Sequence, residues 1–361
     1  MLWHCAFCNA FGFCLTFDTT SVLSPMSTAA KVVLGSLGSL LVSIPVLASQ
    51  EVRVYSGRHY NTDRTVFKNF SDSTGIKVRL LESKGASLVE RLRREGSNSK
   101  ADVILLVDAA RINNAANLGL FSPVQSASLQ KDVPARYRDP KNRWFGVTRR
   151  VRVMVVNSKI VPMSKLKTYA DLGKPFLKGK LCLRRRNNVY NQSLVADQIA
   201  LRGVEATKVW LKGMRSNINQ PYFPGDISLI RAVAQGKCGV GIVNHYYYSR
   251  MLAGVNGAGD QSLAKKIRVF IPNPAHVNIS AAAVAKNAKN RGNAIKLIEY
   301  LASSKGSRQL ANPTFEHPIS SLNTSPYVSR LGAFTPDSVT ISRLSQYQPL
   351  AIQLMAASGW R

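Results

Sequence analysis

The chain has few acidic residues and few cysteines. Only 19 of its 361 residues are Asp or Glu, against 49 Lys and Arg, which gives a formal net charge of +30 at pH 7. Acidic residues are especially scarce around the three tyrosine-bearing segments described below. Calcium and magnesium prefer carboxylate and carbonyl oxygens, and zinc prefers Cys and His. The composition therefore disfavours these divalent ions as ligands of those segments.

Common catalytic and nucleic-acid-binding motifs are also missing. The sequence contains no Gly-x-Ser-x-Gly, no His-Glu-x-x-His, no P-loop and no pair of carboxylates in a catalytic arrangement, which disfavours an exported enzyme. The basic residues are scattered through the chain, as at Arg91, Arg149 and Arg184, and do not form a known nucleic-acid-binding motif. We interpret the charge as a diffuse positive field and expect no nucleic-acid partner.

The longest apolar stretch near the amino terminus is too short to span a membrane. Residues 32–46 are apolar but are interrupted by two glycines and a proline, and a spanning helix needs ~20 apolar residues. A lysine precedes this stretch and small residues follow it, which predicts a secretory signal peptide at residues 26–48 with cleavage after Ala48. A membrane anchor is the alternative. Residues 1–25 are interpreted as lying upstream of the true start.

Two cysteines remain in the predicted exported chain. Cys5, Cys8 and Cys14 belong to the leader, which leaves Cys182 and Cys238, both in strand-like surroundings. An oxidising periplasm would permit a disulfide between them, and two buried thiols that pack as small apolar groups fit the sequence equally well.

Short strands alternate with amphipathic helices after the leader. The first five elements are predicted as strand, helix, strand, helix and strand at residues 52–56, 62–74, 76–82, 87–95 and 101–107. This order predicts an open, largely parallel α/β sheet. A second alternation follows, with strands at 180–183 and 239–244 and helices at 192–202, 206–216 and 228–235. A helix is predicted at 294–303, and the chain after Pro313 reads as loop-rich.

The restart of the alternation predicts two lobes, each a mixed sheet flanked by helices, with a hinge and a central cleft. Residues 149–157 and 277–284 are rich in Val and Ala and are long enough to cross between the lobes. Two crossovers imply a lobe built from discontinuous sequence. The predicted division places residues 49–149 and 278–361 in the N-terminal lobe and residues 150–277 in the C-terminal lobe.

Three tyrosine-bearing segments follow predicted strands and lead into predicted helices. They are residues 54–62, 186–193 and 240–247, and their candidate ligands are Tyr60, Tyr190, Tyr246 and Tyr247. In an open α/β sheet, the ligand crevice lies at the carboxyl ends of the strands, where the following helix presents its N-terminus. Thr62 or Asn61 and Asn244 are plausible helix caps at the first and third segments.

The conformation of the third segment decides what its tyrosines can do. On a strand, Tyr246 and Tyr247 would point to opposite faces, whereas on the first turn of a helix they are about 100° apart and can converge on one atom. Arg250 would then lie on the same helix at i+4 and i+3 from them. Because a free phenol has a pKa near 10, phenolate ligation requires nearby positive charge, and trivalent iron is the natural match.

Each of these residues also has an ordinary structural interpretation. A single tyrosine at a helix start commonly covers a core edge with its hydroxyl in water. Tyr248 is expected to face away into packing, and His245 to be exposed or hydrogen-bonding rather than a ligand. His59 could be a further ligand or a solvated neighbour. The run 184–186 is expected to be a solvated face, although one of its arginines could neutralise a phenolate.

At these residues the sequence resembles the FutA family of cyanobacterial ferric-iron-binding proteins. The resemblance rests on Ser-Gly-Arg-His-Tyr at 56–60, Asn-Val-Tyr-Asn-Gln-Ser at 188–193, Val-Asn-His-Tyr-Tyr at 243–247 and Gly-Asp-Ile-Ser-Leu-Ile-Arg-Ala-Val-Ala at 225–234. It extends over residues 51–318. The resemblance implies a monomeric periplasmic substrate-binding protein of the two-lobed type II fold that is not an enzyme and that delivers iron to an ABC transporter permease in the inner membrane.

The same resemblance implies a ligand set. Tyr60, Tyr190, Tyr246 and Tyr247 would bind Fe3+ as the transported ion, with His59 as an optional ligand and Arg250 as a charged neighbour or substitute. Whether Fe2+ also binds stays open. Closure of a hinged clamp around the ion would let the transporter distinguish loaded from empty protein. The alternative on the same fold is a binding protein for a small inorganic or carboxylate anion.

Overall fold

The computed structural model describes residues 50–58, 60–321 and 324–361. The predicted leader and signal peptide at residues 1–48, and His59, lie outside the described residues. Because every other candidate site residue is described, the model shows where each of the four candidate tyrosines and Arg250 lies.

The sheet is mixed rather than largely parallel. Its strands follow the order β2-β1-β3-β9-β5-β7-β6, with β4 paired to β9 and with β8 and β10 paired to β5. The strands are β1 Glu51–Ser56, β2 Lys77–Glu82, β3 Val103–Val107, β4 Phe121–Ser122, β5 Phe145–Val156, β6 Leu181–Cys182, β7 Val240–Asn244, β8 Arg268–Phe270, β9 Val277–Ala285 and β10 His317–Pro318. The predicted parallel pairs exist at β2-β1-β3 and at β6-β7, but β5 and β9 run antiparallel to their neighbours.

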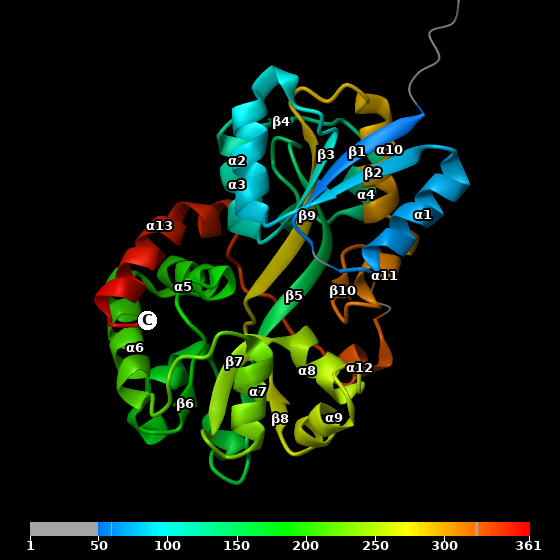
Figure 1. Cartoon of the computed structure of the whole chain (residues 1–361). Coiled ribbons are helices and arrows are strands. Elements are labelled where there is room, and N and C mark those ends of the chain that lie inside the picture. The colour runs from blue at the N-terminus through cyan, green and yellow to red at the C-terminus, as the bar shows by residue number, and fades with distance from the viewer. Residues whose placement is uncertain (1–49, 59, 322–323) are drawn as a thin grey trace, which may run out of the picture. The chain divides into compact units, whose positions relative to one another are not determined.

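Two long strands, β5 and β9, connect the two halves of the sheet and lie side by side (Figure 1). They include the predicted crossover segments. The first part of β5, from Phe145 to Val151, pairs with β9, and the part from Arg152 to Val156 pairs with β7 and β8. Val, Ile and Ala dominate both strands, which suits positions buried on both faces. The boundaries of the two predicted lobes stay a prediction.

The predicted helices are present, with ends that differ by at most one turn. The helices are α1 Asp63–Thr74, α2 Gly85–Glu95, α3 Ala109–Asn117, α4 Ala127–Asp132, α5 Val189–Arg202, α6 Val204–Asn217, α7 Asp226–Ala234, α8 His245–Leu252, α9 Ala258–Lys265, α10 Arg291–Ala302, α11 Ser304–Ala311, α12 Pro326–Ser329 and α13 Ile341–Ala357. In the part of the chain that the structure describes, none of them is long and apolar enough to cross a bilayer.

The prediction that the chain after Pro313 is loop-rich is wrong for its last part, which forms the long helix α13. This helix packs against α5 and α3, and its Ala351, Leu354 and Met355 join the core cluster that also contains residues of α5 and α6. Pro349 lies inside the helix, and Ser and Thr are frequent before it, so the local composition resembled a loop. Burial of the apolar face against α5 outweighs that local preference.

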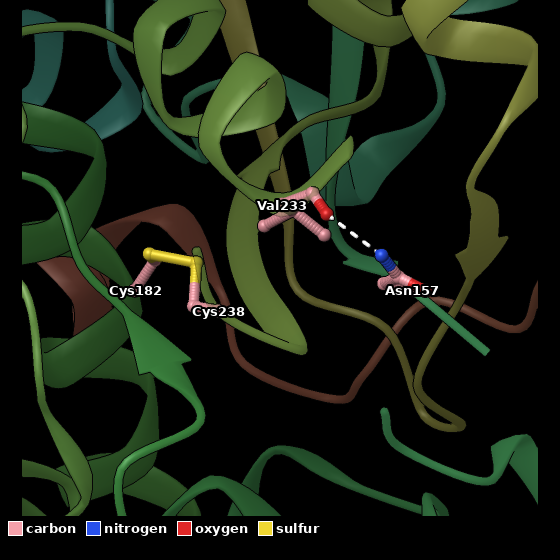
Figure 2. The surroundings of a disulfide bond; sticks show 4 residues. All are labelled: Asn157, Cys182, Val233 and Cys238. Carbon is pink, nitrogen blue, oxygen red and sulfur yellow. Dashed lines mark hydrogen bonds between the residues drawn. A yellow bond between two sulfur atoms is a disulfide. The ribbon is translucent and has the colours of Figure 1, made fainter. Parts of the chain in front are cut away.

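Cys182 and Cys238 form a disulfide, which resolves the alternatives that the sequence left open (Figure 2). The bond joins the end of β6 to the turn before β7 and closes a loop of 56 residues. A loop of that length loses about 4 kcal/mol of conformational entropy in the unfolded chain when it is cross-linked. Nearby, the side chain of Asn157 donates a hydrogen bond to the carbonyl of Val233 at 3.1 Å. The bond therefore stabilises the part of the sheet from which two of the tyrosine segments start.

Candidate metal centre

The three tyrosine segments have the local structure that the sequence predicts. Tyr60 lies in the turn between β1 and α1, and its carbonyl accepts a hydrogen bond from the backbone of Asp63. Tyr190 is in the first turn of α5, where the side chain of Asn188 caps the helix by accepting from the Tyr190 amide at 3.1 Å. α8 begins at His245, directly after β7, so the helical interpretation of the third segment is correct.

Two predicted caps do not form side-chain hydrogen bonds to their helices. Thr62 and Asn244 occupy the N-cap positions of α1 and α8, but neither side chain accepts from its helix. The Asn244 side chain instead accepts from Arg152 at 3.3 Å and donates to the Tyr246 hydroxyl at 3.4 Å. Asn244 therefore orients a candidate ligand rather than capping the helix.

The candidate tyrosines lie together at one cavity. A cavity of about 690 Å³ is lined by Tyr60, Tyr190 and Tyr247, together with residues of the β1, β3 and α5 ends. Tyr246 is buried, and its hydroxyl oxygen lies 3.5 Å from that of Tyr190. The rings of Tyr246 and Tyr247 are 4.3 Å apart between centroids. Tyrosines from three separate segments thus line or adjoin one cavity.

Two arginines that the sequence analysis did not assign to the site, Arg58 and Arg150, lie against these tyrosines. The guanidinium of Arg58 lies 4.9 Å from the ring centroid of Tyr60, and that of Arg150 lies 5.1 Å from the ring centroid of Tyr190. Arg184, the first member of the predicted solvated run, lines the cavity. Arg250 is half-buried on α8 and is not among the described residues that line the cavity. Its role as a charged neighbour stays a prediction.

A buried ion network holds two of these arginines in place. Arg58 Nε donates to Asp63 and its Nη1 donates to Glu316, both at 2.8 Å. Arg150 Nη1 lies 3.7 Å from the other oxygen of Glu316. Burial raises the pKa of Glu316, but Arg58 and Arg150 outweigh it and hold that pKa below its usual value. The carboxylate of Glu316 therefore stays ionised between two buried guanidinium groups.

Three of the candidate phenols, those of Tyr60, Tyr246 and Tyr247, are neutral near pH 7 in the protein without a metal ion. Burial raises the pKa of Tyr60 and of Tyr246 well above the ordinary value of 10. Burial, with a contribution from Tyr190, raises the pKa of Tyr247 to about 12. A cation that binds to these oxygens as phenolates must displace their protons.

The structure also shows the roles of the neighbouring residues. His245 is buried, and its Nδ1 accepts a hydrogen bond from the Val151 amide at 3.1 Å, which matches the hydrogen-bonding role predicted for it. Burial lowers the pKa of His245 to about 4, so the ring is neutral. Tyr248 packs into the main core cluster, as predicted. His59 lies outside the described residues, so its role stays a prediction.

The fold and the cavity define a class of protein. The mixed sheet has two halves that two long strands join, and residues from both halves line the cavity with its tyrosines. This is the architecture of a two-lobed solute-binding protein of the type II fold. The chain belongs to the bacterial extracellular solute-binding protein family, whose family model matches residues 98–329.

Relatives within this class are named for iron. The chain is 40% identical over 319 residues to the iron uptake protein A1 of a Synechocystis species, covering 86% of this chain and 88% of that protein. It is 29% identical to the Fe(3+)-binding periplasmic protein of Serratia marcescens, over 83% of this chain and 86% of that protein. The Trichodesmium FutA (IdiA) structure with iron and citrate is 38% identical, covers 86% of this chain and 100% of that chain, and superposes with a TM-score of 0.83.

Proposed function

We propose that this chain is a periplasmic substrate-binding protein that captures ferric iron and delivers it to an ABC transporter permease. The observation that carries the proposal is the convergence of tyrosines from three segments on one cavity. The proposed ligands are Tyr60, Tyr190, Tyr246 and Tyr247, with His59 as an optional ligand and Arg250 as a charged neighbour. Relatives named for iron uptake and ferric iron binding support the choice of ion.

The charges of the site favour ferric over ferrous iron. Four phenolates carry four negative charges, so Fe3+ leaves a net charge of −1 and Fe2+ leaves −2 before other groups are counted. Arg58, Arg150 and Arg184 then supply the positive charge that stabilises the anionic complex in buried surroundings. Hard phenolate oxygen also suits the harder, trivalent ion.

Capture would proceed by closure of a hinged clamp. Tyr60 follows β1, in the proposed lobe of residues 49–149 and 278–361, whereas the other three tyrosines belong to the proposed lobe of residues 150–277. An ion that binds both sets favours the closed state by its differential affinity, and β5 with β9 is the natural hinge. A closed, loaded monomer would be the form that the permease recognises. Export by a signal peptide at residues 26–48 completes the proposal.

A visible absorption band tests the ferric assignment. The purified protein loaded with ferric iron should show a phenolate-to-iron charge-transfer band, and Tyr247→Phe should weaken it because one phenolate is removed. Tyr248→Phe, on the same helix but packed into the core, should leave the band unchanged. An iron-loaded protein without such a band would contradict phenolate ligation.

Iron binding should release protons, because the phenols of Tyr60, Tyr246 and Tyr247 are protonated before the ion binds. The pKa of Tyr247 is raised to about 12, and those of Tyr60 and Tyr246 are also raised, so lowering the pH stabilises the phenol form that competes with iron. We therefore expect the apparent iron affinity to rise with pH between about 6 and 8, with about one proton released per phenolate formed. A pH-stat titration measures the protons directly. Tyr247→Phe should release one fewer, and release that does not depend on the tyrosines would contradict the model.

A small anion is a second candidate ligand, because Lys84, Arg111 and Arg184 also line the cavity. These cations would attract sulfate, phosphate or a carboxylate. Calorimetric titration with ferric citrate and with each anion alone separates the two functions. We expect tight binding only when iron is present, whereas equally tight binding of an anion without iron would favour the second candidate.

A further inference from the structure

A second group of potential ligands lies apart from the tyrosine cavity. Asp197 is on α5, His276 directly precedes β9, and Asp337 lies in the segment that leads to α13. One ligand atom from each of the three lies within 4.8 Å of the others. Their exposed fractions are 0%, 1% and 5%, respectively. None of them is among the described residues that line the tyrosine cavity.

Four buried polar atoms of this group form no hydrogen bond among the described residues, although His276 Nδ1 lies within ion-pair distance of Asp197. These atoms are Asp197 Oδ1, His276 Nδ1, His276 Nε2 and Asp337 Oδ2. The other oxygen of each carboxylate is held in place, because Asp197 Oδ2 accepts from Gln198 at 3.0 Å and Asp337 Oδ1 accepts from the Val339 amide at 2.8 Å. A buried polar atom without a partner costs about 1–3 kcal/mol. A single ion bound between these side chains would give several of these atoms a partner at once.

The spacing of these atoms suits a metal ion. His276 Nδ1 lies 3.3 Å from Asp197 Oδ1 and 3.9 Å from Asp337 Oδ2. Ligands about 2.1 Å from a tetrahedral ion are separated from one another by about 3.4 Å. A protonated His276 would pair more closely with Asp197, at 3.3 Å, than with Asp337, at 3.9 Å. A cation at the centre would contact all three groups.

We propose that Asp197, His276 and Asp337 form a second metal site that holds one divalent transition ion, with water as a fourth ligand. Two carboxylates and a neutral imidazole neutralise a divalent charge, which removes the large cost of burying two carboxylates close together. The mixed oxygen and nitrogen donors suit Zn2+ better than Mg2+ or Ca2+, which prefer oxygen alone. Because all three side chains are buried, the site suits an ion that stays bound as part of the structure rather than one that is transported.

The position of the site gives the ion a structural role. It would join α5, the helix that carries Tyr190, to the start of β9 and to the segment that leads to α13. The backbone at His276 is already fixed, because its amide donates to the Tyr169 hydroxyl at 2.9 Å, and that hydroxyl donates to the Arg152 carbonyl at 2.7 Å. The ion would therefore hold the C-terminal segment against a preformed surface.

Zinc binding to chelator-treated protein tests the site. The full chain carrying Tyr190→Phe and Tyr247→Phe is used as the background, so that zinc binding at the proposed iron ligands is weakened. We expect one Zn2+ per chain after dialysis, measured by elemental analysis, and a melting temperature that rises when Zn2+ is added. His276→Gln and Asp337→Asn should each weaken zinc binding by at least about tenfold.

The controls separate metal binding from a purely structural role of the three residues. Asp337→Asn provides the test if His276→Gln does not fold, because Asp337 is the most exposed of the three. Glu205→Gln removes an equal charge at an exposed position on α6 and should bind zinc as the background does. Zinc that is not retained, or that is retained equally in Asp337→Asn, would overturn the proposal. The proposal would also be overturned if Asp337→Asn were less stable while zinc did not change the melting temperature of the background protein. That result would mean that the three side chains form only a buried ion-paired group without a metal ion. Failure of the iron proposal would leave these outcomes unchanged.

Discussion

Tyr190→Phe is expected to lower the affinity for ferric iron by about 100-fold or more, which corresponds to about 2.7 kcal/mol. The substitution removes one phenolate but keeps the ring, and therefore keeps the contact with the Arg150 guanidinium at 5.1 Å. It also removes the hydroxyl that lies 3.5 Å from the Tyr246 hydroxyl, so a second ligand loses its neighbour. Competition against a chelator of known iron affinity, followed by the charge-transfer band, measures the change.

The matched control for this loss is Tyr248→Phe. Both substitutions remove one tyrosine hydroxyl, but Tyr248 packs into the core and does not line the cavity. Its variant should bind iron within about twofold of the unsubstituted protein, since the Tyr248 side chain packs into the core and not into the cavity. A Tyr190→Phe affinity that stays within about twofold of the unsubstituted protein would remove Tyr190 from the ligand set, and an equal loss of affinity in both variants would point to a general effect on folding.

The features that could be predicted from the sequence depend on residues close together in the chain. The tyrosine segments could be predicted because each follows a strand and starts a helix, and because an open sheet gathers such turns at one edge. The helical period also predicted that Tyr246 and Tyr247 share one direction and that Tyr248 faces away. In the structure the rings of Tyr246 and Tyr247 lie together, and Tyr248 is in the core. Near neighbours in the chain decide these features, so one sequence is enough to predict them.

The residues that the sequence did not place depend on distant contacts. Arg58 and Glu316 are separated by 258 positions, and Arg58 also contacts Ser280 across 222 positions. Nothing in either local segment indicates this pairing. The same holds for α13, whose packing on α5 outweighs a loop-like composition. The group of Asp197, His276 and Asp337 likewise exists only once three distant segments have folded together.

Glu316→Gln is expected to lower the free energy of unfolding by about 3–5 kcal/mol at pH 7, because it leaves two buried guanidinium groups without their shared carboxylate. The pKa of Glu316 is held below its usual value in the folded protein, so its stabilising contribution is fully present at pH 7 and is lost as the pH falls through that lowered pKa. Urea unfolding at pH 7 measures the loss. Glu90→Gln, in a surface pair with Arg93 in which both side chains are 60% exposed, should change stability by less than about 0.5 kcal/mol.

Iron binding should respond to Glu316→Gln in a different way from stability. The charge of Glu316 contributes to the raised pKa of Tyr60, whereas Arg58 acts in the opposite direction. Removing the carboxylate leaves Arg58 to favour the Tyr60 phenolate, so the folded variant should retain its iron affinity or gain some. A variant that is less stable yet binds iron at least as well would assign Glu316 to holding the arginines in place. A parallel loss of stability and affinity would mean that the network is also required to position Tyr60.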